Sequence, residues 1–181
     1  MMELRLFLQI CMLFFGVMGY LRGVYREFIS TVGILVSLFF LTQFDWIIGV
    51  LVPRMDAGIR FGINAIYIIA FAFFSYQQAA TVFVPSRYRG SRGKISLPEF
   101  DNWQMKLVGA ALGAFNGYLI VGSLWYFMDL LEYPFSGLFL IPRLESASAN
   151  FVTWLPLVWL QQGNLIVWLV MGLFLLVVIF R

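Results

Sequence analysis

The chain has 181 residues, of which 62% are hydrophobic, 19% aromatic and only 12% charged, and its formal net charge at pH 7 is +3. Soluble domains carry about 25% charged residues, so this composition excludes a water-soluble fold and predicts an integral membrane protein. The single cysteine, Cys11, excludes an internal disulfide and a thiolate metal cluster, and the absence of histidine removes the commonest metal ligand and general base.

Three uncharged apolar runs in the first half of the chain predict membrane helices. A bilayer core needs about 20 apolar residues of helix, and fewer where flanking arginines extend to the headgroups. The runs predict spans at residues 6–21, 28–44 and 63–84. The first run resembles a secretory signal, but a second span follows at once and no small-residue cleavage site is visible. We therefore expect it to be an uncleaved anchor.

The second half of the chain begins with its one clearly hydrophilic stretch, the basic loop at residues 86–104, and a fourth span is predicted at 107–128. Prolines then break residues 134–160, for which we expect an interfacial segment with an amphipathic helix near 144–155. The last apolar run, 165–180, is either a short fifth span or a buried re-entrant helix, and we favour the span.

These elements predict an all-α integral membrane protein with a single domain at 1–181. It has four to five transmembrane helices and an interfacial amphipathic helix. Placing the turn between the first two spans in the cytoplasm puts eight of the twelve basic residues inside and four outside. Cytoplasmic loops of membrane proteins are enriched in lysine and arginine, so we expect the N-terminus outside and the C-terminus inside. We expect the basic loop to be solvated and to contact anionic headgroups, in preference to nucleic acid or the acidic face of a partner.

The turn GYLRGVYRE places charged residues between two apolar runs. Gly23 can adopt the left-handed conformation that ends a helix, and Arg22 and Arg26 can reach the headgroups. Glu27 falls in the first turn of the second span, where the positive helix end favours a carboxylate. We interpret these four residues as an interface anchor for the hairpin. The alternative is a proton- or substrate-binding ion pair, because ionisable residues at membrane depth are often functional.

Glycines recur at four-residue spacing in the fourth span, as Gly109, Gly113 and Gly117. Helices in lipid associate through close backbone approach, which small residues permit, so the three glycines predict a helix-packing face. A pore lining would instead show a polar stripe, and Asn116 and Ser123 are the only polar residues of this span.

The hairpin pattern Gly19-x-x-Arg22-Gly23-x-x-Arg26-Glu27, with Gly33 beyond it, resembles the first hairpin of the colicin V production protein family of bacterial inner-membrane proteins. The glycines of the fourth span and the Ile141-Pro142 that follows are also similar in order and spacing, so the resemblance covers residues 5–155. It implies four membrane spans, an amphipathic segment after the fourth, and a role in export of a peptide toxin or in envelope homeostasis. It implies no catalytic residues.

The chain departs from the family pattern mainly by losing charge. No acidic residue lies early in the first span, Met105-Lys106 replaces an acidic–basic pair, and Asn116 stands where an arginine is expected. Residues 165–180 extend beyond the family pattern. These losses fit a chain recruited as a partner of a larger assembly.

We therefore expect a non-enzymatic protein of the bacterial inner membrane that acts as a scaffold or accessory subunit. Its expected partners are membrane lipids and other membrane-protein subunits, with no cofactor, no metal and no nucleic acid. The alternative is a component of a toxin-export or small-solute transport or channel system. An enzyme is the third choice, because no nucleophile–base pair, metal-ligand spacing or phosphate loop is found in the sequence.

Overall fold

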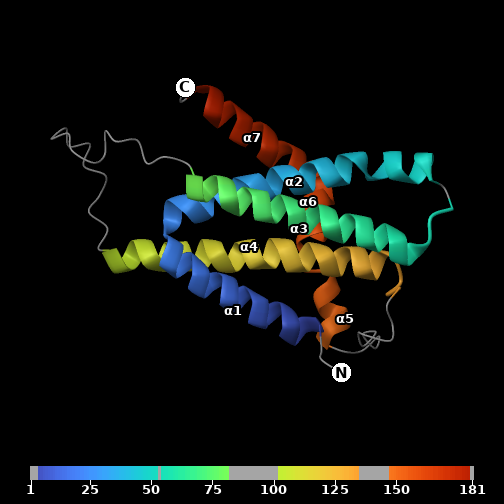
Figure 1. Ribbon diagram of the computed structural model, residues 1–181, viewed down its shortest axis with the longest axis horizontal. Coiled ribbons are helices and arrows are strands. Elements are labelled where there is room, and N and C mark those ends of the chain that lie inside the picture. Colours follow the sequence, from blue (N-terminus) through green and yellow to red (C-terminus); the bar gives the residue numbers. More distant parts are fainter. Residues whose placement is uncertain (1–3, 53, 82–101, 135–146, 180–181) are drawn as a thin grey trace.

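The computed structural model describes residues 4–52, 54–81, 102–134 and 147–179, and every regular element in these ranges is a helix (Figure 1). Four long helices are followed by three shorter ones and a single 3-10 turn. The elements are α1 (Leu4–Arg22), α2 (Val24–Leu51), α3 (Ala57–Thr81), α4 (Asn102–Leu130), α5 (Ala147–Val152), α6 (Pro156–Gln161), η2 (Gln162–Asn164) and α7 (Leu165–Ile179).

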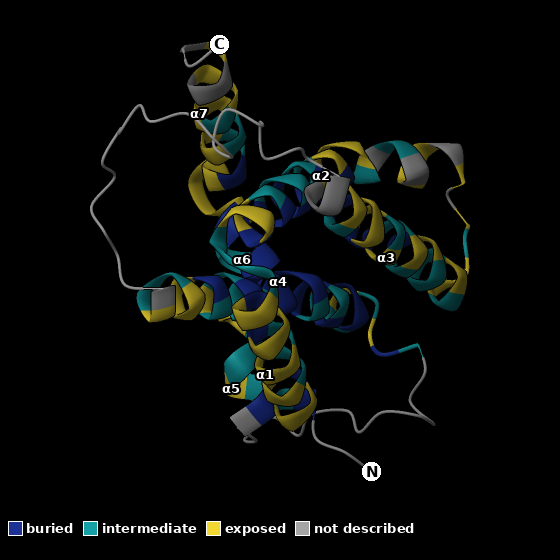
Figure 2. Cartoon of the chain, turned by 60° about the vertical axis from the view of Figure 1, so that its left-hand side comes forward, coloured by how far each residue is buried: buried dark blue, intermediate teal, exposed yellow. Residues whose placement is uncertain are grey.

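Helix α4 lies at the centre of the bundle. It packs most extensively against α1, and it also contacts α2 and α3, which pack against each other. Figure 2 shows the dark, buried faces of α2 and α4 turned toward one another, with exposed residues on the outer sides of α1 and α3. The largest apolar core cluster joins the inner faces of α2, α3 and α4 to α6 and α7, with Leu38, Ile68, Leu119 and Leu160 among its members.

The segment α5–α6–α7 crosses this bundle (Figure 1). It contacts α1 through α5, α4 through α6, and α2 through α7. Pro156 begins α6 and packs on Gly122 of α4, where an added Cβ would lie 2.5 Å from the proline Cδ. Gly122 therefore allows α6 to lie directly on α4. The chain breaks again between α6 and α7 at Gly163, whose φ of 58° is in the left-handed region that favours glycine.

Five helices are long and apolar enough to cross a membrane, as expected for an all-α membrane protein. The first four overlap the predicted spans, although α2 and α4 extend several residues beyond the predicted 28–44 and 107–128. Helix α3 begins six residues before the predicted 63–84, and residues 82–84 lie outside the described residues. The fifth apolar stretch differs from the predicted 165–180, because it runs from Ser148 to Leu175 and includes the break at Gly163. Helix α7 alone has 15 residues, fewer than the roughly 20 that a bilayer core requires.

The interfacial segment expected at 134–160 is partly described. Its described residues contain two short helices, α5 and α6, in place of one helix near 144–155, and residues 144–146 lie outside the described residues. Trp154 is exposed, as a headgroup-level anchor would be, whereas Phe151 is half-buried and stacks on Trp125 of α4. Leu155 and Pro156 are buried, so this segment is docked on the bundle.

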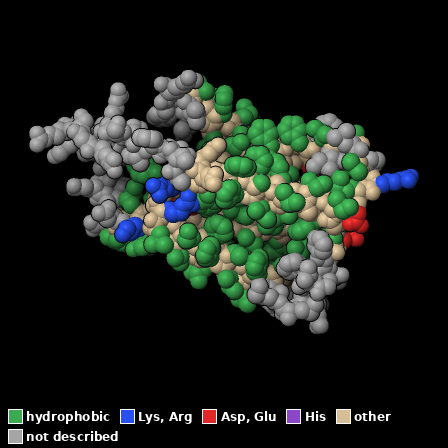
Figure 3. Space-filling model, in the orientation of Figure 1, with side chains coloured by type: hydrophobic (Ala, Val, Ile, Leu, Met, Phe, Trp, Pro, Cys, Tyr) green, Lys and Arg blue, Asp and Glu red, His purple; other side chains and the backbone are tan. Residues whose placement is uncertain are grey.

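Large apolar side chains remain exposed along the helices that surround the core. Phe14 and Leu13 on α1, Ile66 on α3, and Trp168 and Phe174 on α7 each leave more than half of their surface uncovered. Figure 3 shows this apolar surface as a broad band between two polar ends. A band of this kind is what lipid tails cover, and with five apolar helices it identifies a multi-pass membrane protein.

Candidate functional site: a buried polar cluster beside the α1–α2 turn

The turn between α1 and α2 occupies a single residue. Arg22 ends α1, Val24 begins α2, and Gly23 between them has a φ of 85°. The amide of Gly23 donates to the Gly19 carbonyl oxygen at 2.9 Å, which satisfies a carbonyl at the end of α1. A residue with a Cβ would be strained at this φ, so glycine is what permits so short a turn.

Glu27, four residues after this turn, has its side chain inside the bundle. The residue is 0% exposed. Its Oε2 accepts hydrogen bonds from the side-chain amide of Asn116, at 2.9 Å, and from the hydroxyl of Tyr76, at 3.2 Å. Its Oε1 lies 3.5 Å from Nη1 of Arg22. Donors from three other helices thus surround one carboxylate.

Asn116 of α4 is the second fully buried member of the cluster. Its Nδ2 donates to the carboxylate of Glu27 and also, at 3.2 Å, to the backbone carbonyl oxygen of that residue. Its Oδ1 accepts from the hydroxyl of Thr31 at 2.7 Å, and that hydroxyl lies 2.8 Å from the Glu27 carbonyl oxygen. Asn116 therefore connects α4 to two successive turns of α2.

Arg22 closes the cluster on its outer side. Its guanidinium lies 4.5 Å from the centre of the Tyr76 ring, and its Nη2 donates to the Tyr76 carbonyl oxygen at 3.0 Å. Because Nη1 also faces Glu27, one planar side chain contacts α2 and α3 together. The side chain of Arg22 keeps 20% of its surface exposed, which is consistent with a position where the bundle meets the headgroups.

The four residues interpreted as an anchor therefore have different surroundings. Arg26 is exposed, as an interface anchor would be, and Gly23 forms the turn. Glu27 differs from the exposed Arg26, because its side chain is buried between α2, α3 and α4. Arg22 is partly exposed beside the turn and also contacts the buried Glu27.

The glycine face of α4 lies directly beside this cluster and is covered by α1. A Cβ on Gly109 would lie 2.7 Å from the Gly19 carbonyl oxygen, and a Cβ on Gly113 would lie 2.9 Å from the Gly19 Cα. Both distances are shorter than real Cβ contacts, so the two helices touch through their backbones. Gly117 differs, because a Cβ there would meet the side chain of Phe15, at 2.9 Å.

Several of these partners are not identified by the sequence reasoning above. Asn116 appears there only as a polar residue of the fourth span and as a departure from the family pattern, and neither Thr31 nor Tyr76 is considered. A signal does exist, since Glu27 and Thr31 are four residues apart and so share a face of α2. Gly16 and Gly19, three residues apart on α1, similarly indicate the surface that meets the glycines of α4.

The cluster has one incompletely satisfied atom. Glu27 Oε1 is buried and has no hydrogen bond within normal geometry, only the longer ion pair with Arg22. Buried polar atoms are nearly always hydrogen-bonded, so an atom of this kind can mark a functional group. Within the described part of the chain, no three acidic or cysteine side chains come together as metal ligands.

Two cavities formed by described residues are distinct from this carboxylate. One, of about 620 Å³, is an apolar groove between α1 and α4 that opens on the outside of the bundle. A polar cavity of about 320 Å³ lies near the other end of α2, between Thr42, Asp45, Tyr126 and Gln161. Asp45 there is paired with Arg60 at 2.6 Å. Neither cavity is lined by Glu27 or Asn116.

Comparison with known proteins adds no relative: no family model, no curated protein and no solved structure matches the chain.

Proposed function

We propose that this chain is a non-enzymatic scaffold or accessory subunit of a larger assembly in the bacterial inner membrane, of the colicin V production type. The observation that carries the proposal is the closed interface among α1, α2 and α4. Backbone contact at Gly19 and Gly109 and the hydrogen bonds between Glu27 and Asn116 fix these helices against one another. A rigid body of this kind suits a structural subunit better than a conduit that must open.

Helix α7 consists wholly of apolar residues and glycine, and only part of its surface packs against the bundle. Among the long helices α1–α4 it contacts α2, and Trp168, Met171 and Phe174 are exposed along it. In the proposed assembly, the exposed apolar face of α7 is available to lipid or to another subunit. The colicin V production pattern ends before this helix, which is consistent with a chain adapted to a different assembly.

The proposed orientation places the α1–α2 turn in the cytoplasm and the N-terminus outside. The described residues near that turn carry Arg22, Arg26 and Lys106 against the single acid Glu27. At the opposite end, cations and carboxylates are mixed, and the acids there include Asp45 and Asp129. Basic residues are enriched on the cytoplasmic side of membrane proteins, so this difference in charge between the two ends supports the proposed orientation.

The subunit proposal is tested by isolating the full chain in a mild detergent and measuring the mass of the complex that contains it. We expect a complex of defined composition that is larger than the chain alone. The double variant Trp168→Ala/Phe174→Ala should weaken the complex. The matched control is the double variant Ile66→Ala/Phe73→Ala, which removes exposed side chains from α3 and should leave the complex intact. A chain that is stable and always monomeric would contradict the proposal.

A component of an export or transport system is the second candidate, and Glu27 is the specific observation that favours it. A buried carboxylate with one unsatisfied oxygen, next to an arginine, is typical of coupling sites in membrane transporters. This candidate is tested by reconstituting the full chain into vesicles that contain a pH-sensitive dye. Proton flux that exceeds the flux of protein-free vesicles and is abolished by Glu27→Gln would favour transport over the scaffold.

A further inference from the structure

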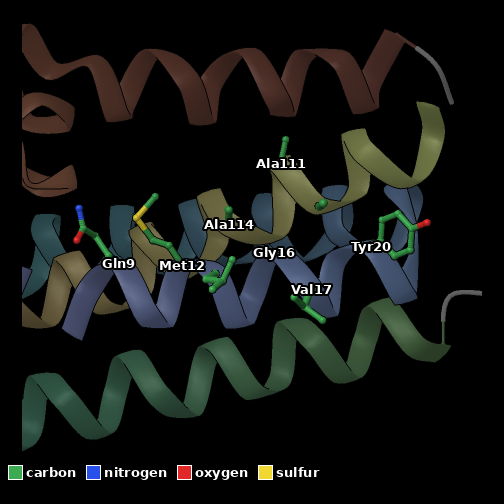
Figure 4. A pocket seen from close by; sticks show the side chains of 9 residues that line it. Gln9, Met12, Gly16, Val17, Tyr20, Ala111 and Ala114 are labelled. Carbon is green, nitrogen blue, oxygen red and sulfur yellow. The ribbon is translucent and has the colours of Figure 1, made fainter. Parts of the chain in front are cut away.

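The apolar groove between α1 and α4 is formed by small residues. Gly16 on α1 and Ala110, Ala111 and Ala114 on α4 are among the residues that line it, and the groove has a volume of about 620 Å³. Figure 4 shows Gln9 toward one end and Tyr20 toward the other, with the lining side chains of α1 arranged along the helix. The groove opens on the outside of the bundle, where lipid tails would surround the protein.

One end of the groove is positively charged. The Lys106 ammonium lies 5.5 Å from the centre of the Tyr20 ring, which itself lines the groove. Arg26 is exposed near the same turn, and neither cation lies within ion-pair distance of a described carboxylate. Figure 3 shows lysine and arginine side chains gathered at this end of the molecule. An anionic group at Tyr20 would therefore meet positive charge that no described carboxylate neutralises.

The length of the groove favours an acyl chain over a helix of another protein. Gln9 and Tyr20 are eleven residues apart, which corresponds to about 16 Å along α1. The hydrocarbon core is about 30 Å thick, so the groove extends through about one leaflet. A helix that spans the membrane would extend through both leaflets and well beyond this groove, whereas one acyl chain occupies one leaflet below its own headgroup.

We propose that this groove binds an anionic phospholipid, with one acyl chain between α1 and α4 and the phosphate beside Tyr20 and Lys106. The lipid comes from the leaflet that contains the α1–α2 turn. Its acyl chain covers the small residues that line the groove, and its phosphate neutralises the Lys106 ammonium. The site does not depend on the scaffold proposal, because a transport component with the same fold would bind the same lipid.

The experiment is native mass spectrometry of the purified full chain with dioleoyl phosphatidylglycerol or dioleoyl phosphatidylcholine at equal concentrations. We expect a bound phosphatidylglycerol that is retained several-fold better than phosphatidylcholine. Lys106→Gln should reduce this preference to near one, and Ala111→Phe should reduce binding of both lipids because it fills the groove. Soluble glycerol 3-phosphate should not compete, since it lacks the acyl chain.

Two control variants make the same kinds of substitution, the loss of a cation and the addition of an aromatic ring, outside the groove. Arg54→Gln removes an exposed cation at the opposite end of the molecule, and Ile66→Phe adds a ring on the exposed side of α3. Both should retain the lipid preference of the parent chain. Equal retention of the two lipids, or phosphatidylglycerol binding that survives both Lys106→Gln and Ala111→Phe, would overturn the proposal. A dimer that loses bound lipid would also overturn it, by showing that a second copy fills the groove.

Discussion

The side chain of Asn116 binds Glu27 at two points, donating to the carboxylate at 2.9 Å and to the backbone carbonyl oxygen of the same residue at 3.2 Å. Both residues are fully buried, so no water from the surface can replace these bonds if Asn116 is lost. The contact joins α4 to the first turn of α2, at the level where α1 ends.

Replacing Asn116 with leucine should therefore destabilise the bundle. Glu27 Oε2 would lose one of its two donors, and removing one partner from a buried polar group costs about 1–3 kcal/mol. Unfolding of the purified chain in detergent measures the loss. Ser123→Ala on the same helix is the control, because the buried Ser123 hydroxyl has no hydrogen-bond partner among the described residues. That variant should be neutral or slightly stabilising, and equal losses for the two would argue against a special role for Asn116.

Alanine at Gly19 or at Gly113 should force α1 away from α4. At each position the new Cβ would lie within 3 Å of backbone atoms of the opposite helix, and backbone cannot move aside as a side chain can. We expect a lower unfolding temperature for both variants. Gly62→Ala and Gly172→Ala are matched controls, since both glycines lie within helices and face open space. They should be unchanged or gain about 0.5–1 kcal/mol, and a loss as large as at Gly113 would contradict the interpretation.

Arg22 and Arg26 should respond differently to replacement by lysine. Interpreted from the sequence, both are headgroup anchors that tolerate the exchange. In the structure, Arg22 stacks on Tyr76 while donating to its carbonyl oxygen and facing Glu27, and lysine cannot reproduce this planar arrangement. We expect Arg22→Lys to cost roughly 1–3 kcal/mol of unfolding free energy and Arg26→Lys almost nothing. Equal tolerance at both positions would restore the simple anchor interpretation.

The orientation in the membrane is tested by labelling a cysteine at residue 91 in a Cys11→Ser background. Residues 86–101 of the predicted basic loop, including Ser91, lie outside the described residues, so this prediction rests on the distribution of basic residues in the sequence. An impermeant maleimide should not react with Ser91→Cys in intact cells and should react after the membrane is opened. Efficient labelling of intact cells would place the N-terminus in the cytoplasm.

The sequence is sufficient to predict the four long helices, because apolar run length and flanking charge determine which segments cross a membrane. It also predicts the break at Gly23, where only glycine suits the conformation. It does not show that Glu27 points inward, because this depends on which face of α2 meets α3 and α4. The break at Gly163 and the docking of Pro156 on Gly122 likewise depend on packing between segments far apart in the chain.

The central claim is that the hydrogen bonds between Glu27 and Asn116 stabilise the packing of the α1–α2 hairpin against α4. A double-mutant cycle tests it most directly, with Glu27→Met and Asn116→Leu made singly and together. The unfolding free energy of all four proteins is measured in the same detergent. Residues in one hydrogen-bond network show coupling energies of about 0.5–3 kcal/mol. We therefore expect the unfolding free energy lost by the double variant to be smaller than the sum of the two single losses, by an amount in this range. Strictly additive losses would contradict the account, because they would mean that the two side chains stabilise the protein independently.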